Sequence, residues 1–462
     1  MYIQGKEPTF QHSNPKPNIY RVLVILVLIV FFGTVLTGFA KGEVEPLFMP
    51  TPTPTRTTHS FAVEGETHFA AGDLNASIEA FQKAAALDPT DSEVLVELAR
   101  VQTYSSSLLT TDAERGQRLE EALESINKAK EIAPNDSHVL AVRAFVLDWN
   151  ATNPLLEDAN ASTDFLNEAE SEAIMALQLD NTNTLALAYY AEILVDQAKW
   201  NQAQQYIEQA VELDPSLMDV HRIMAYTYET LGEYNLAIQE YRKAVNIMPN
   251  LTFLYLSIGR IYRYLELYDQ ALEYFATAVN LNEQLGINDP IPYLAIANTY
   301  AQMGEFFIAA LNVQVALDMT PANPDVYGQL GVVYHKGRNY EGAIPALKCA
   351  LDGCTAEESC EVRQCDPNTD PMVAIEGMPL TDGTSVYYFT YGSVLSGLHR
   401  EGDDDYCDRA LVVFDELRTK YPDDETIMSI VRAGEEICNY AAIGTTEEAP
   451  AATETPAVET AP

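Results

Sequence analysis

The chain repeats a short pattern every 34 residues, and this regularity restricts its fold more than any other feature. The pattern is a small residue, an aromatic or aliphatic residue, an alanine and then Leu-Asp-Pro or a near match, and successive copies end at residues 181, 215, 249 and 283. A unit of this length accommodates two helices and their turns, and such units bury a continuous core only by stacking on their neighbours. The period therefore predicts an all-α solenoid of helix pairs.

The clearest unit, Met218–Leu251, shows why the pattern suits packed helices. Small residues let two helices approach closely, while aromatic side chains fill the space between adjacent layers. In this unit the pattern comprises Ala225 and Tyr228, a break at Gly232, then Ala237, Tyr241 and Ala244, and a terminal Pro249. These positions resemble the tetratricopeptide repeat, a family whose members mostly hold peptides or proteins on an inner, concave surface and perform no chemistry themselves.

About nine such units fit between residues 58 and 424. Units two and three carry about 11 and 13 additional residues near Ser105–Arg118 and Ala151–Thr163, which we expect to form protruding loops or lengthened helix ends. After unit nine, residues 424–442 predict one more helix, because the last apolar face of a solenoid needs a cap. The predicted fold is thus an α-solenoid of about nine tetratricopeptide helix hairpins with a C-terminal capping helix, preceded by one transmembrane helix.

An uncharged apolar run at residues 22–40 predicts that transmembrane helix, since about 20 residues span a bilayer core. The preceding tail, residues 1–21, carries Lys6, Lys16 and Arg21 against Glu7 alone, so the positive-inside rule places it in the cytoplasm and the rest of the chain outside. A cleaved signal peptide ending near Ala40 is the alternative. Either interpretation exports the repeats.

Two low-complexity segments flank the repeats, which we expect to occupy residues 61–442. Residues 41–60 are rich in Pro and Thr, which favours an extended stalk. Residues 443–462 combine glutamates and prolines without a basic residue, so we expect an acidic, disordered tail.

Composition and motifs restrict the function. The chain has 27 basic and 68 acidic residues, a net charge of −41 that would repel nucleic acid. The seven histidines are dispersed, and neither a Gly-rich phosphate loop nor a G-x-S-x-G motif is present. We therefore predict no enzymatic activity, no cofactor and no nucleic-acid partner.

Helical spacing places several basic and aromatic side chains on the inner face of the first helices. Arginines can grip a carboxylate through two hydrogen bonds, and tyrosines beside them add apolar area, so we predict a groove for an acidic segment or a free C-terminal carboxylate. In the alternative interpretation, the arginines only neutralise Glu229, Glu233 and Glu266 on a solvated surface. The predicted groove residues are Arg222, Tyr226, Arg260, Arg263, Tyr264, Asn298, Gln302 and Lys336.

All six cysteines lie in one C-terminal stretch. Because consecutive helices run antiparallel, Cys407 and Cys438 should be adjacent and form a disulfide. Cys349, Cys354, Cys360 and Cys365 suit two further disulfides that pin an insertion at residues 355–384, with the pairing left open. Zinc is the alternative for these four, although their spacing exceeds that of most structural zinc sites and exported thiols oxidise.

These observations favour a non-enzymatic, membrane-anchored scaffold that binds a protein or peptide outside the cytoplasm. The alternative is a structural subunit of an envelope secretion or polysaccharide assembly complex, packed laterally on a membrane partner.

Overall fold

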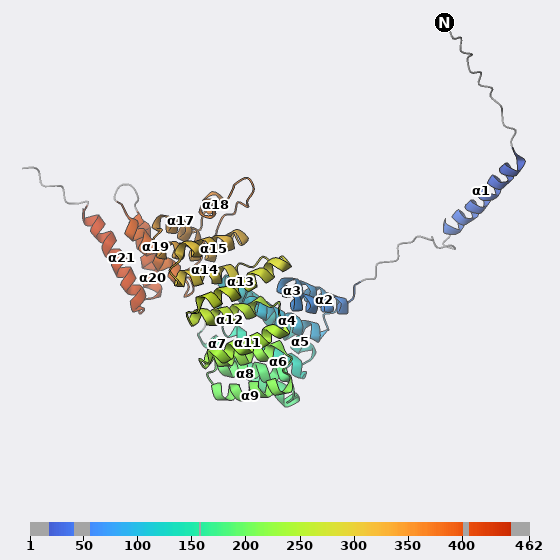
Figure 1. The fold of residues 1–462 in the computed structure, drawn as a ribbon, viewed down its shortest axis with the longest axis horizontal. Coiled ribbons are helices and arrows are strands. Elements are labelled where there is room, and N and C mark those ends of the chain that lie inside the picture. The colour runs from blue at the N-terminus through green and yellow to red at the C-terminus, as the bar shows by residue number, and fades with distance from the viewer. Residues whose placement is uncertain (1–17, 41–55, 157–158, 401–405, 445–462) are drawn as a thin grey trace, which may run out of the picture. The chain divides into compact units, whose positions relative to one another are not determined.

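The computed structural model describes residues 18–40, 56–156, 159–400 and 406–444, and it falls into two units, residues 1–56 and 57–462. Within these described residues every regular element longer than a single bridge is a helix (Figure 1). Most of the basic tail, most of the stalk, the acidic turn at 401–405 and the acidic C-terminal segment lie outside the described residues.

Helix α1 (Ile19–Ala40) belongs to the first unit. Its 22 residues extend about 33 Å at 1.5 Å per residue, close to the thickness of a bilayer core. The stretch Ile19–Gly38 has a mean hydropathy of 2.7, and almost all of its large apolar side chains are exposed. In length and composition, α1 therefore fits a membrane span or a signal sequence.

In its described residues the second unit has nine helix pairs, a short helix between the eighth and ninth pairs, and a final helix, which confirms the predicted fold class. Its first helix begins at Thr58, three residues before the predicted start of the repeats. The pairs are α2 (Thr58–Ala71) with α3 (Leu74–Leu87), α4 (Ser92–Ser106) with α5 (Asp112–Ile132), α6 (Ser137–Asn150) with α7 (Ala159–Leu179), α8 (Thr184–Asp196) with α9 (Trp200–Leu213), α10 (Met218–Thr230) with α11 (Tyr234–Ile247), α12 (Thr252–Tyr264) with α13 (Tyr268–Leu285), α14 (Ile291–Gln302) with α15 (Phe306–Met319), α16 (Pro324–Lys336) with α17 (Tyr340–Leu351), and α19 (Ser385–Leu398) with α20 (Tyr406–Lys420).

Small residues allow the two helices of each pair to pack closely, as the repeat pattern predicts. Ala225 on α10 and Ala237 on α11 are fully buried. In the next pair, a Cβ added at Gly259 would overlap the ring of Phe275. The large residue of the second helix thus occupies the space that the small residue of the first helix leaves free. Close packing therefore explains why small and large residues recur at fixed positions of the repeat.

The additional residues of units two and three lengthen helices, which confirms one of the two predicted outcomes. Helices α5 and α7 each have 21 residues, whereas α11, the corresponding second helix of the clearest unit, has 14. The turn before α5 does not project into solvent, because Asn323 at the start of α16 donates a hydrogen bond to Thr110. The insertion therefore joins repeats that are far apart in the sequence.

The C-terminal end carries the predicted cap and insertion. Helix α21 (Glu425–Gly444) packs on α19 and α20. The insertion between α17 and α19 contains a short helix, α18 (Ala356–Arg363). Among the described residues the hydrophobic core forms two large clusters, one from Phe69 to Ile261 and one from Leu294 to Cys438. The solenoid thus has an N-terminal part and a C-terminal part with separate cores.

Candidate functional site

The first helices of the N-terminal part pack against one another and leave little of their inner face exposed. Asp219 on α10 pairs with Arg100 on α4 at 2.7 Å and accepts hydrogen bonds from Tyr104 and Tyr189. Phe253 on α12 stacks on Tyr104, with 5.2 Å between the ring centroids. Burial alone would raise the pKa of Asp219, but the Arg100 guanidinium and the Tyr104 hydroxyl lower it to about 2. These contacts join residues 119 positions apart and fill the inside of the superhelix.

A second contact closes the superhelix at its edge. The Asn250 side chain, in the turn between α11 and α12, donates a hydrogen bond of 3.0 Å to the carbonyl of Ala70 at the end of α2. Gly72 lies against the Asn250 backbone with a φ of +90°, and a Cβ there would overlap it. A glycine is therefore required where the first repeat touches the turn between the fifth and sixth helix pairs.

Arg222 was predicted to contact a ligand, and the structure places it inside the molecule rather than on an open face. Its side chain is buried, and its two terminal nitrogens donate hydrogen bonds of 2.8 and 2.6 Å to the carboxylate of Glu192 on α8. The guanidinium also lies over the ring of Phe145 at 5.6 Å. Because both terminal nitrogens of this guanidinium already bind Glu192, Arg222 cannot form a bidentate contact with a ligand carboxylate. Arg222 is therefore part of the interior.

Tyr226 likewise has an internal partner. Its hydroxyl donates a hydrogen bond of 2.6 Å to Asp196 at the end of α8. Beside this pair, Asp148 on α6 is 1% exposed, and neither of its carboxyl oxygens has a hydrogen-bond partner in the described part of the chain. Burial and the neighbouring carboxylates Asp196 and Glu192 raise the pKa of Asp148 well above its usual value. Burial likewise raises the pKa of Asp196, to about 6.

The inner face opens at α12, α14 and α16. Arg260 has a 57% exposed side chain and lies 3.6 Å from Glu229, the neutralising contact that the alternative interpretation predicts. Tyr264 is 69% exposed, and its ring lies 5.1 Å from that of Tyr234. The remaining predicted residues of this face are all exposed: Asn298, Gln302 and Lys336.

Arg263 lies in this open region beside Arg260. It is half-buried on α12, its guanidinium lies 5.8 Å from the ring centre of Phe275, and it donates one long hydrogen bond of 3.4 Å to the carbonyl of Ala295. Within the described residues it forms no ion pair with a carboxylate. Burial and the positive charge of Arg260 lower the pKa of Arg263. Two guanidiniums thus lie on one surface, and only Arg260 pairs with a carboxylate of the described residues, an arrangement that an added anion would stabilise.

Six cysteines form three pairs near the C-terminus. Cys407 on α20 lies beside Cys438 on α21, with Cα atoms 5.5 Å apart. The other pairs are Cys349 with Cys354 and Cys360 with Cys365, at Cα distances of 4.7 and 5.1 Å. No group of three or more His, Cys, Asp or Glu residues is arranged to hold a metal ion in the described part of the chain.

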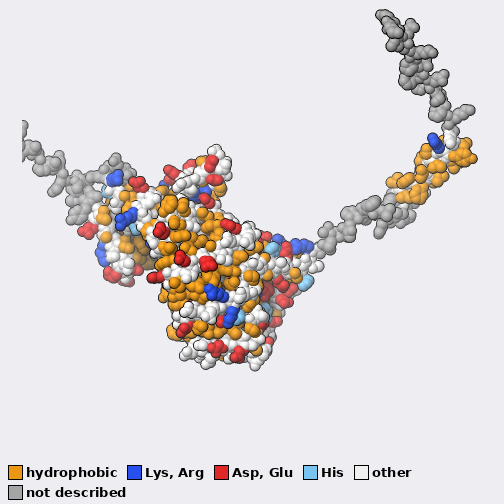
Figure 2. Space-filling view, in the orientation of Figure 1, with side chains coloured by type: hydrophobic (Ala, Val, Ile, Leu, Met, Phe, Trp, Pro, Cys, Tyr) orange, Lys and Arg blue, Asp and Glu red, His pale blue; other side chains and the backbone are white. Residues whose placement is uncertain are grey.

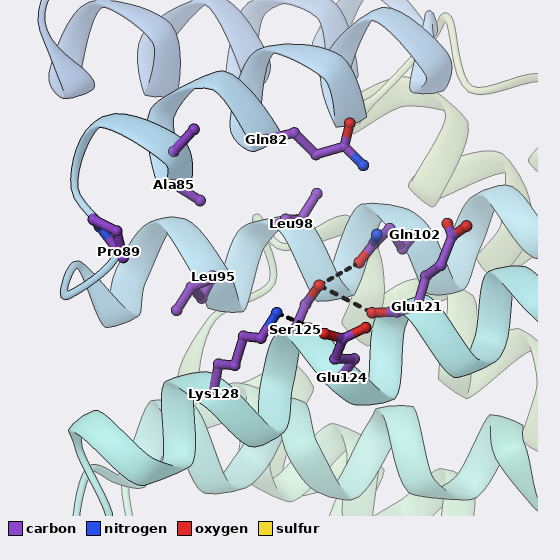
Figure 3. A pocket seen from close by; sticks show the side chains of 11 residues that line it. Gln82, Ala85, Pro89, Leu95, Leu98, Gln102, Glu121, Glu124, Ser125 and Lys128 are labelled. Carbon is purple, nitrogen blue, oxygen red and sulfur yellow. Dashed lines mark hydrogen bonds and ion pairs between the residues drawn. The ribbon is translucent and has the colours of Figure 1, made fainter.

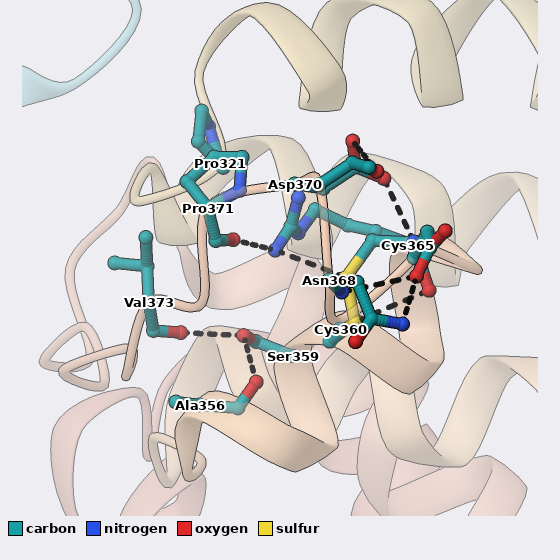
Figure 4. Close-up of a disulfide and its surroundings, with 12 residues drawn as sticks. Pro321, Ala356, Ser359, Cys360, Cys365, Asn368, Asp370, Pro371 and Val373 are labelled. Carbon is teal, nitrogen blue, oxygen red and sulfur yellow. Dashed lines mark hydrogen bonds between the residues drawn. A yellow bond between two sulfur atoms is a disulfide. The ribbon is translucent and has the colours of Figure 1, made fainter.

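Figure 4 shows the surroundings of the Cys360–Cys365 pair. The loop that follows α18 folds back over it, because Arg363 donates a hydrogen bond of 2.6 Å to the carbonyl of Pro371. Ser359 donates another to the carbonyl of Val373. The cysteine pair and these hydrogen bonds together hold the insertion in one conformation.

Comparisons with known proteins found similar solved structures and family models. Among solved structures, the chain is similar to a thermophilic tetratricopeptide repeat protein of Thermus thermophilus (19% identity, TM-score 0.36, 44% of this chain and 98% of that one). It is also similar to a tetratricopeptide repeat protein from Parabacteroides merdae (15% identity, TM-score 0.35, 60% and 98%). A third is YrrB, described as having an unusual peptide-binding site (19% identity, TM-score 0.30, 44% and 96%).

No curated protein matches the chain. Models of the tetratricopeptide repeat match residues 59–91, 190–250 and 254–285, which correspond to the first, fourth, fifth and sixth helix pairs. The helix pairs within these residues thus match the tetratricopeptide repeat, and the second unit of the chain is an α-solenoid of helix pairs.

Proposed function

We propose that this protein is a non-enzymatic scaffold that holds an acidic segment or a free C-terminal carboxylate of a partner protein against α12 and α14. The observation that carries this proposal is the arginine pair Arg260 and Arg263. Tetratricopeptide folds are generally interaction scaffolds without catalytic activity, which supports the class of function. The predicted groove is reduced to its C-terminal part, because Arg222 and Tyr226 are engaged inside the molecule.

The chemistry of the open face suits a carboxylate. Arg260 and Arg263 are separated by three positions on α12, so their side chains project from the same side of the helix. Arg263 retains guanidinium N–H groups that no carboxylate of the described chain occupies, and a bidentate contact with a ligand carboxylate would use them. Tyr264 adds an exposed aromatic surface, and the amides of Asn298 and Gln302 add hydrogen-bonding groups for the backbone of the bound segment.

The proposed location is outside the cytoplasm, with α1 as a membrane anchor. The apolar length of α1 and the basic residues before it support this orientation. The three cysteine pairs support it independently, because disulfides persist mainly in exported proteins. A reporter fused after residue 442 should be active only outside the cytoplasm, and a mature N-terminus at Lys41 would replace the anchor with a cleaved leader.

The binding proposal is tested with an acidic peptide that ends in a free carboxylate and with its amidated form. We expect Arg263→Ala to weaken binding of the free acid by about 2 kcal/mol or more, because a buried, paired charge would be lost. The matched control is Arg242→Ala, since Arg242 lies on α11 and its guanidinium contacts Tyr274 and Tyr262. Equal binding by both variants would exclude the arginine pair as the site, and equal binding of the amidated peptide would exclude recognition of the terminal carboxylate.

The alternative, lateral packing in a membrane complex, is favoured by a different surface. Helix α15 exposes Phe307, Leu311 and Val315 at 77%, 45% and 38%, and their four-residue spacing places them on one stripe. Figure 2 shows hydrophobic side chains gathered where Figure 1 places α13 to α15. If this face packs on an integral membrane protein, Phe307→Ser should abolish its recovery from solubilised membranes. Leu213→Ser, at an exposed leucine on α9, should leave recovery unchanged.

A further inference from the structure

The open face of α12 to α16 carries basic side chains that the described chain leaves largely unneutralised. Arg263 forms no ion pair within the described residues, and Arg260, 57% exposed, has only Glu229 at 3.6 Å. Lys336 is the last residue of α16, the position that Tyr264 occupies in α12, and it is exposed and unpaired in the described part of the chain. This face therefore attracts an anion.

Basic side chains near the first repeats differ, because they are paired. Figure 3 shows a cleft between α3, α4 and α5, where Lys128 lies 2.7 Å from the carboxylate of Glu124. On the same helix, Arg118 pairs with Glu121 at 3.1 Å. An acidic segment would have to compete with these carboxylates, whereas at Arg263 it meets no such competitor among the described residues. Charge thus favours the open face over this cleft as a site for an acidic segment.

The chain itself contains an acidic segment directly after α21 (Glu425–Gly444). This segment, residues 445–462, lies outside the described residues and has no basic residue; its four glutamates are Glu447, Glu448, Glu454 and Glu459. Because the chain has a net charge of −41, most of its surface repels such a segment. Charge complementarity therefore favours binding of residues 445–462 where cations are unpaired.

The segment is long enough to reach α12. Packed helices connect α21 to α12 in five steps, through α19, α16, α15 and α14. Packed helix axes lie about 8 to 10 Å apart, so the five steps separate the axes of α21 and α12 by at most about 50 Å. The 18 residues of 445–462 span about 60 Å when fully extended. The length of the segment thus permits contact with the open face of its own chain.

We infer that residues 445–462 bind to Arg260 and Arg263 of their own chain and compete there with the acidic segment of a partner protein. This inference rests on the proposed function, because it assigns a regulator to the same site. A glutamate of the segment forms the bidentate contact with the guanidinium of Arg263. Because the segment is tethered, its effective concentration at the site is on the order of millimolar, so even a weak contact is populated. A partner must displace the segment, which lowers the partner's apparent affinity.

The test compares the parent, as the full chain in detergent, with a glutamine variant that carries Glu447→Gln, Glu448→Gln, Glu454→Gln and Glu459→Gln. The probe is a fluorescent peptide of alternating glutamates and alanines, and fluorescence anisotropy measures its binding. We expect the probe to bind the glutamine variant about three- to tenfold more tightly than the parent, because the competitor is lost.

A matched control separates competition from the change in net charge. It replaces four exposed glutamates of α2, α4 and α5 with glutamines, which alters the net charge equally and should change probe binding much less. These glutamates are Glu66, Glu93, Glu120 and Glu131. If the control variant gains as much affinity as the glutamine variant, the effect is general repulsion and the inference is overturned.

A second measurement locates the segment on the chain. A fluorescent peptide with the sequence of residues 445–462 is added to the glutamine variant, and we expect saturable binding that Arg263→Ala weakens and Arg242→Ala leaves unchanged. Equal binding to both arginine variants would overturn the inference. If the probe binds the parent and the glutamine variant equally, the inference fails while the proposed function stands. If the probe binds neither chain, the proposed function fails as well.

Discussion

The inner faces of α4 to α10 and of α12 to α16 derive from the same repeat, yet they use their arginines in opposite ways. In the N-terminal part, Arg100 and Arg222 are paired with the carboxylates of Asp219 and Glu192 inside the superhelix. On α12, where the inner face opens, Arg260 is exposed and Arg263 has no carboxylate partner among the described residues. The same residue type on the same face of the repeat thus stabilises the closed region and remains available for a ligand in the open region.

The largest expected effect tests the closed part directly. Arg222→Ala should lower the free energy of unfolding by about 3 to 5 kcal/mol, because it leaves the buried carboxylate of Glu192 without its partner. Arg260→Ala, at an exposed position of the open part, should change stability by less than about 1 kcal/mol. Thermal unfolding followed by circular dichroism measures both. Equal, small effects would mean that the two faces do not differ as the structure indicates.

The next effect concerns the end of the C-terminal part. Replacing Cys407 and Cys438 with serines should destabilise the cap by about 3 to 4 kcal/mol, because their disulfide closes a long loop in the unfolded chain. Hydrogen exchange should show faster opening of α20 and α21 than of α4 to α10. Rapid labelling of both thiols in the native, unreduced parent would show that the disulfide is not formed.

A smaller effect tests the packing of the repeat itself, in the helix pair between the closed region and α12. Ala237→Leu should cost about 1 to 3 kcal/mol, since α10 and α11 have no space for a larger side chain there. The exposed Leu236 beside it provides the control, as Leu236→Ala should be nearly neutral. If the melting temperature of Ala237→Leu matches that of the parent, the packing assigned to this pair is wrong.

The smallest effect is a change in pH dependence within the closed part. Burial and two neighbouring carboxylates raise the pKa of Asp148, so the folded state binds its proton more tightly than the unfolded state. Stability should therefore fall as the pH rises from about 4 through the higher folded pKa. Asp148→Asn removes this loss and should raise the melting temperature more at pH 8 than at pH 4.5. Asp269→Asn, at an exposed position of α13, should show no such difference.

The helix pairs and the cap could be predicted because their causes are local. A small residue such as Ala225 or Gly259 on the first helix must pack against a large residue on the second helix. This requirement recurs in every helix pair, and it therefore appears in the sequence as a 34-residue period. The adjacency of Cys407 and Cys438 follows from the same antiparallel order of consecutive helices. Of the candidate site, the sequence identified Arg260, Arg263 and Tyr264 by helical spacing alone.

What the sequence could not indicate is which of these side chains remain accessible. The contacts of Asp219 with Arg100, and of Asn250 with Ala70, join residues 119 and 180 positions apart. Each repeat is rotated slightly relative to the one before it, and these contacts depend on the total rotation over several repeats. The sequence of a single repeat does not determine that total rotation. Helical spacing therefore placed Arg222 and Arg263 on the same inner face, whereas only the closure of the superhelix buried the first against Glu192 and left the second open to a ligand.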